Sequence, residues 1–276
     1  MRYLRLIFVL LLALTVAFVI GFNNRCNQQD NKSISRTEKS ANSSTAISIN
    51  TIDEIPLPAG FTRVGLPKDS FGEWLRNIKL KKDNTVYLYN GRSIARQDLH
   101  YAVLDISTGN KDLQQCADAI MRLKSEYYFS RKEYDKISFR TGNGTNLNFD
   151  AFAKNHSNCY SHDCLLKFLE KVFMNCGTYT VDEMTKPISI NDIESGDVFV
   201  KAGSPGHAMI VVDVAIKETM HKKVYMLAQS YMPAQDMHIV INPDDEKLSP
   251  WYEVNDEERI ITPGWIFDKK QLKRWK

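Results

Sequence analysis

The sequence predicts an α+β fold in which a helix leads into a run of antiparallel strands. From residue 196 onward, short apolar segments alternate with turn residues, a pattern that is typical of β-hairpins. The clearest pair is Val198–Val200 and His207–Val214, which flank a loop with Gly203-Ser204-Pro205 at its tip. We therefore expect an antiparallel hairpin in which His207 opens the second strand and faces a cleft.

The remaining elements follow from caps and apolar spacing. Apolar residues recur at helical spacing in three segments, with Ser70, Asp112 and either Ser161 or Asp163 as the expected N-caps: residues 70–78, 113–129 and 164–175. Further strands are expected where apolar or aromatic residues run between turn signals: residues 85–89, 101–106, 136–139, 224–229 and 238–241. The aromatic C-terminal tail is expected to pack back on the body of the domain.

The first 22 residues predict export. Leu6–Phe22 is an almost unbroken apolar run that follows Arg2 and Arg5, as in a secretory signal, yet it is long for a cleaved signal peptide and short for a membrane span. A signal peptide and an uncleaved anchor both fit. Cys26 would suit a lipoprotein, but Asn23-Asn24-Arg25 lacks the small residues of a lipid-attachment site. We expect an exported protein, periplasmic or attached to a membrane through its N-terminal segment.

Composition divides the rest of the chain into two parts. Residues 23–53 are polar and read as a disordered linker, and residues 54–276 as a single α+β domain with parts at 54–158 and 159–276. The formal charge is +3 and falls to +1 without the two arginines of residues 1–22, so no nucleic-acid partner is expected.

No Cys/His spacing suggests zinc, and we expect no metal and no cofactor.

The chain has five cysteines, an odd number in a protein expected to be exported. Cys159 and Cys164 are close enough in sequence to bridge locally. Cys116, Cys164 and Cys176 all fall in helical patterns, where a cysteine often serves as a small apolar packing residue.

The order of groups in the second half resembles papain-like cysteine amidases and peptidases of the NlpC and CHAP type. Asp163-Cys164 opens a helix, Gly196-Asp197 opens a strand, His207 opens the next strand, and Gln229 ends the one after it. The resemblance implies a papain-like core over about residues 160–240, with a mixed α/β extension before it. It also implies Cys164 as nucleophile, His207 as general base and Gln229 as the residue that orients the ring. A helix N-terminus favours the thiolate that such chemistry needs.

Cys116 is the rival nucleophile. The sequence Gln114-Gln115-Cys116 is similar to the papain arrangement in which a glutamine precedes the catalytic cysteine. Its position on one apolar stripe with Ile120 and Leu123 instead favours burial. Cys164, followed by two leucines, could likewise be a packing thiol, so the choice of nucleophile stays open.

Residues 229–238 form a polar loop between two strands, as is typical of loops that line a site. We expect Ser230, Tyr231, Gln235 and His238 to bind a ligand there. Two functions follow: a cysteine amidase or peptidase acting on peptidoglycan peptides or similar amides, or a non-catalytic envelope protein whose loop binds a peptide, glycan or protein partner.

Over residues 55–276 the chain also resembles an uncharacterised family of exported bacterial proteins, catalogued as a domain of unknown function. The stretches that carry the resemblance include 112–119, 196–199, 204–208, 227–235, 250–252 and 262–265. This resemblance implies an envelope location and no particular activity.

Overall fold

The structure is a computed structural model that describes residues 49–276, which belong to one compact unit. The predicted signal or anchor over 1–22, Cys26 and most of the predicted linker lie outside the described residues. The fold starts slightly earlier than residue 54, because Thr51 bridges to Lys79 and the Ile52 side chain is fully buried. Within residues 49–276, the helices are all too short or too polar to cross a membrane.

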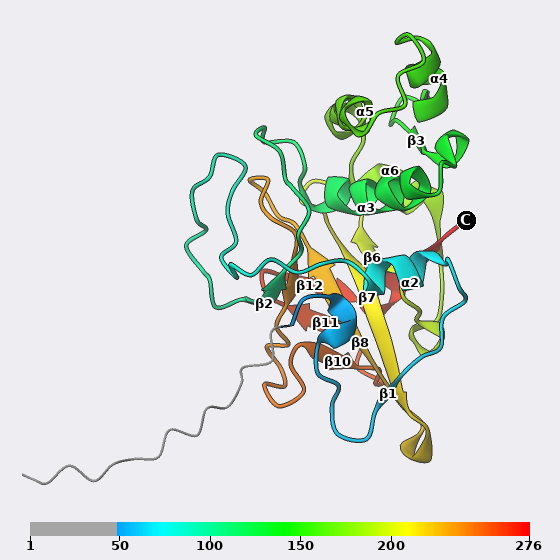
Figure 1. Cartoon of the computed structure of the whole chain (residues 1–276). Coiled ribbons are helices and arrows are strands. Elements are labelled where there is room, and N and C mark those ends of the chain that lie inside the picture. The colour runs from blue at the N-terminus through cyan, green and yellow to red at the C-terminus, as the bar shows by residue number, and fades with distance from the viewer. Residues whose placement is uncertain (1–48) are drawn as a thin grey trace, which may run out of the picture. The chain divides into compact units, whose positions relative to one another are not determined.

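A nine-stranded antiparallel sheet forms the centre of the fold (Figure 1). Its strands follow the order β2-β9-β8-β7-β6-β13-β5, with β1 added to β7 and β10 added to β8. The strands are β1 Thr62–Arg63, β2 His100–Val103, β5 Thr185–Pro187, β6 Val198–Lys201, β7 His207–Lys217, β8 Lys222–Gln229, β9 His238–Val240, β10 Trp251–Glu253 and β13 Leu272–Trp275. Two hairpins complete the β structure: β3 Ser138–Arg140 with β4 Asn146–Asn148, and β11 Arg259–Thr262 with β12 Trp265–Asp268.

The helices are arranged in layers above the sheet (Figure 1). They are α2 Phe71–Arg76, α3 Cys116–Ser130, α4 Phe149–Lys154, α5 His162–Asn175 and α6 Thr178–Met184. α3 packs directly on β7 and β8, whereas α5 packs on α3 and α4 and therefore lies farther from the sheet. The first residue of α3, not of α5, thus lies next to the strands.

The α+β class and the antiparallel hairpin are confirmed. β6 and β7 pair antiparallel with Val200 opposite Ala208 and Lys201 opposite His207. The strand expected over residues 85–89 is wrong, because Tyr87 and Leu88 make only isolated bridges and Val86 donates its N–H to the Gln97 side chain. The aromatic tail packs inward as expected, with Trp251 and Phe267 almost fully buried.

The two halves of the domain share one sheet. β1 and β2 come from the first half, and β2 forms the edge beside β9. The first half is therefore an integral part of the sheet and not an extension attached to it, and it supplies α3 to the same core.

An ion-paired carboxylate fastens the first half of the domain to β7. The Asp213 side chain is fully buried beside a β-bulge, and its two oxygens accept from Arg63 Nε at 2.7 Å and Arg76 Nη2 at 2.6 Å. Arg63 also donates to the carbonyl of Ile55 at 2.7 Å, and Arg76 to that of Val64 at 3.1 Å. One carboxylate thus joins β7 to η1 (Ile52–Glu54), β1 and α2.

We expect Asp213→Ala to destabilise the protein by about 3–5 kcal/mol, because it leaves two partly buried guanidinium groups without their buried carboxylate and with the half-exposed Asp53 as their remaining ion-pair partner. The measurement is urea unfolding followed by circular dichroism. The control is Asp98→Ala, which removes an ion pair whose side chains are both 65% exposed and should cost less than about 1 kcal/mol. Equal effects of the two variants would show that Asp213 does not hold the fold together.

Candidate functional site

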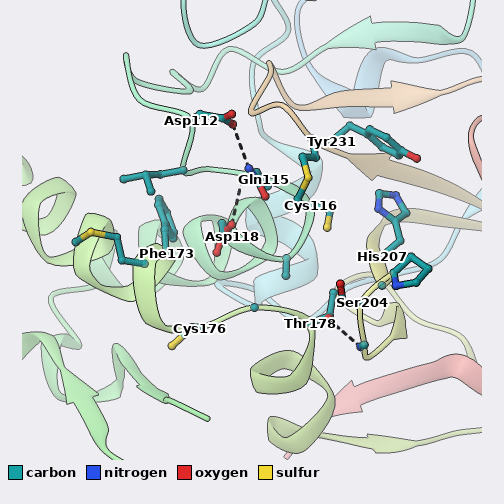
Figure 2. Close-up of a pocket in the computed structure, with 18 of the residues that line it drawn as sticks. Asp112, Gln115, Cys116, Asp118, Phe173, Cys176, Thr178, Ser204, His207 and Tyr231 are labelled. Atoms are coloured by element: carbon teal, nitrogen blue, oxygen red, sulfur yellow. Dashed lines mark hydrogen bonds between the residues drawn. The ribbon is translucent and has the colours of Figure 1, made fainter. Parts of the chain in front are cut away.

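A pocket of about 910 Å³ opens where α3, the loop before β7 and the end of α5 meet (Figure 2). Cys116 lies on one side and His207 on the other, with Tyr231 and Trp265 completing the wall near the histidine. The site therefore combines a cysteine from the first half of the domain with a histidine from the second.

Cys116 is the first residue of α3. The sequence predicts this helix from residue 113, but Gln115 is extended and its N–H donates to the Asp118 carboxylate at 3.1 Å, so the helix begins at Cys116. The first-turn N–H groups of a helix have no intrahelical acceptor and carry partial positive charge. Burial nevertheless raises the pKa of the Cys116 thiol, although the nearby backbone of Ala208 acts in the opposite direction.

His207 lies at the start of β7, as predicted, and is only 2% exposed. Its ring packs against Tyr231, Trp265 and Phe267, with ring centroids 5.0, 5.3 and 5.9 Å away. The preceding Gly206 has no room for a side chain, because a Cβ there would lie 2.4 Å from the carbonyl oxygen of Gly203. Aromatic packing and a tight loop therefore fix the position of the imidazole.

A chain of buried hydrogen bonds fixes the tautomer of His207. His238 Nδ1 lies 2.9 Å from the carbonyl oxygen of Asp236, which can only accept, so Nδ1 carries the proton. Burial lowers the pKa of His238 to about 4, so its Nε2 is a bare acceptor and receives the Gln229 amide NH₂ at 3.2 Å. The Gln229 oxygen then faces His207 Nε2 at 2.8 Å and must accept from it.

His207 is consequently a neutral imidazole with its proton on Nε2. Burial lowers its pKa to about 4, although the bond to Gln229 opposes this shift. Within residues 49–276, Nδ1 makes no hydrogen bond and no hydrogen bond joins the ring to Cys116. Nδ1 is therefore the ring nitrogen whose lone pair is free to accept a hydrogen bond or a proton.

Cys164 is not available as a nucleophile, which corrects the expectation from sequence. It lies in the first turn of α5 as predicted, and Ser161 caps that helix. Its sulfur, however, forms a disulfide with Cys159, the local bridge that the sequence left open. A disulfide sulfur carries no thiol proton and cannot act as a thiolate.

The polar loop 229–238 lies mostly behind the pocket wall and supports it through buried hydrogen bonds. Ser230, Gln235 and His238 are buried, and among the four residues expected to bind a ligand only Tyr231 lines the pocket. The Ser230 hydroxyl donates to the Gln235 carbonyl and lies 3.1 Å from that of Gln114, and the Ala234 N–H donates to Asp112. The loop thus anchors the segment that leads into α3, and the expectation of a ligand-binding role for Ser230, Gln235 and His238 is not supported by their burial.

Several residues that line the pocket are not among the site residues that the sequence predicts. Asp118, Thr178 and Trp265 all line the cavity, and Cys176 adds a second free thiol. The spacing of Gln115 and Asp118 was the available signal, since an acidic residue three positions after an N-cap marks a helix start. No group of three or more potential metal ligands gathers anywhere in the described part of the chain.

Gln229→Glu tests the hydrogen-bond chain without an assay of activity. A carboxylate beside the His207 Nε2–H should raise the pKa of His207 by about one to three pH units, because it stabilises the imidazolium. Histidine imidazole resonances followed by NMR across pH report this value. Gln271→Glu, at the end of η5 (Lys269–Gln271), is the control and should leave His207 near its parent pKa of about 4. An unchanged His207 titration in Gln229→Glu would contradict the assigned contact.

The disulfide can be checked by mass spectrometry. Alkylation with iodoacetamide in denaturant without reductant should leave the tryptic peptide 155–167, which contains Cys159 and Cys164, unmodified and two hydrogens lighter than its reduced form. The peptide 112–122 should carry the label on Cys116 and serves as the internal control. Labelling of both cysteines in 155–167 would restore Cys164 as a candidate nucleophile.

Comparison with known proteins identifies the family. No curated protein and no solved structure matches the chain. A family model described as domain of unknown function 4846 matches residues 52–274, which is nearly all of the described part of the chain. This match agrees with the resemblance of residues 55–276 to an uncharacterised family. The chain belongs to the family described as domain of unknown function 4846.

Proposed function

We propose that this protein is a cysteine hydrolase that cleaves amide bonds, with Cys116 as nucleophile, His207 as general base and Gln229 as the residue that orients the imidazole. The observation that carries the proposal is the pocket in which a helix N-terminal thiol faces a neutral histidine of fixed tautomer. A nucleophile, a base and a group that holds the base are the three parts that such catalysis requires.

The reaction follows from the protonation states. The thiol and the imidazole are both neutral, so the Cys116 proton passes to His207 Nδ1 as the sulfur attacks the carbonyl carbon of the substrate. The carbon–nitrogen bond then breaks, and the imidazolium returns the proton to the leaving amine. Water hydrolyses the resulting thioester with His207 again as base, which releases the acid and restores the thiol.

Stabilisation of the oxyanion is assigned to the first turn of α3. The earliest intrahelical bond in this helix is donated by Ala119 to the carbonyl of Gln115, which leaves the N–H groups of Cys116 and Ala117 without helical acceptors. Backbone donors beside the attacked carbonyl stabilise the negative charge that develops on its oxygen. Because Cys116 is the first residue of α3, these donors lie next to its thiol.

The layout supports a papain-like mechanism acting on peptides. A cysteine that opens a helix packed on an antiparallel sheet, followed by a histidine and a glutamine on neighbouring strands, is typical of papain-like amidases. We propose a peptide substrate in the cell envelope, with peptidoglycan peptides as the first class to test, and export through the N-terminal segment. The alternative of a non-catalytic binding loop at 229–238 has less support, because most of its polar side chains are buried.

The test is hydrolysis of soluble cell-wall peptides, with new amino groups detected by liquid chromatography and mass spectrometry. Cys116→Ala and His207→Ala should each lower kcat/KM by about 10³-fold or more, because each removes a group that reacts. Cys176→Ala removes the other free thiol that lines the pocket and should keep the parent activity.

Two results would contradict the proposal. Hydrolysis that persists in Cys116→Ala would show that the thiol is not the nucleophile. Loss of activity in Cys176→Ala with retention in Cys116→Ala would transfer that role to Cys176. Thermal unfolding of each variant checks that a loss of activity does not reflect a loss of fold.

A further inference from the structure

Asp118, two residues after the candidate nucleophile, has a carboxylate oxygen that helix capping does not use. Its side chain lines the pocket and the residue is only 6% exposed. Oδ2 accepts from the Gln115 N–H at 3.1 Å, whereas Oδ1 has no hydrogen-bond partner in the described structure. Capping of α3 therefore accounts for one oxygen of this carboxylate and leaves the other unexplained.

The pocket offers Asp118 no positive charge. Asp112 and Asp118 are the two carboxylates on its wall, and no lysine or arginine of residues 49–276 lines it. The Asp112 carboxylate already has hydrogen-bond donors, since one of its oxygens accepts from both the Gln115 side chain and the Ala234 N–H. Figure 2 shows Asp118 between the start of α3 and the side of the pocket formed by Phe173 and Cys176.

We propose that Asp118 Oδ1 binds a protonated amine of the substrate, so that the pocket selects peptides that carry a free amino group near the bond to be cleaved. The inference rests on the proposed function and names its substrate class. An ammonium supplies both the positive charge and the hydrogen-bond donors that a buried carboxylate lacks.

The electrostatic surroundings agree with this assignment. Burial raises the pKa of Asp118 to about 8, and no cation among the described residues that line the pocket compensates its negative charge. A hydroxyl or amide donor could bond to Oδ1 but would leave that charge without a counterion. An ammonium offsets it directly.

Binding to an inactive variant tests the inference independently of catalysis. In a Cys116→Ala background, the probe alanyl-γ-glutamyl-lysine is titrated by calorimetry in three forms: unmodified, acetylated at the α-amino group and acetylated at the lysine side chain. Acetylation of the amine that Asp118 recognises should weaken binding at least about tenfold, and the two acetylated probes distinguish a peptide N-terminus from a side-chain amine.

Asp118→Asn in the same background should remove this preference, because its amide cannot neutralise an ammonium while its oxygen can still accept from Gln115. Asp112→Asn is the matched control and should retain the preference, since that carboxylate already has two donors. Equal binding of all three probes, no binding of any of them, or an unchanged preference in Asp118→Asn would each overturn the inference. Hydrolysis without amine preference would overturn it and leave the proposed function standing.

Discussion

The candidate site depends on the close contact between the first turn of α3 and the start of β7. Small residues on both sides permit it: Ala117 and Ala208 are almost fully buried, and the backbone of Ala208 lies close enough to the Cys116 thiol to lower its pKa. A larger side chain at either position would separate helix and strand, as expected for a closely packed interior. Since Cys116 and His207 reach the pocket from these two elements, their separation is set by the packing of α3 on β7 and not by a flexible loop.

β7 carries a buried polar group near each end of its apolar run, and each is compensated differently. His207 is held neutral by burial and connects through Gln229 and His238 to the backbone carbonyl of Asp236. Asp213 is bound by two arginines from the first half of the domain. Buried polar groups are costly unless every partner is in place, so both arrangements restrict the fold to one geometry. The ion pair fixes the segment that covers the sheet, and the histidine chain fixes the direction in which His207 can accept a proton.

Local patterns predicted the histidine half of the site and left the cysteine open between Cys164 and Cys116. The positions of His207 and Gln229 followed from strand spacing, because consecutive antiparallel strands place their ends side by side. Cys116 lies on α3, which contacts β7 although the two are far apart in the sequence. The spacing of apolar residues within one element cannot predict such a contact. The helix start was also misplaced by three residues, since Asp112 is a stronger N-cap signal than the Gln115 that the structure uses. Cys164 opens a helix as a nucleophile would, yet its disulfide partner Cys159, only five residues away, removes it from the chemistry.

Burial keeps the three titratable groups closest to the proposed reaction uncharged. It raises the pKa of Cys116 and that of Asp118, and lowers that of His207. A thiolate–imidazolium pair is therefore not the resting state, and a reaction here requires the substrate to change the electrostatics of the pocket. An ammonium on Asp118 would do so, because it offsets the carboxylate charge that otherwise raises the pKa of Cys116. Amine recognition and activation of the nucleophile would then be one event, which explains why an acidic residue can lie two positions from a thiol that must lose its proton.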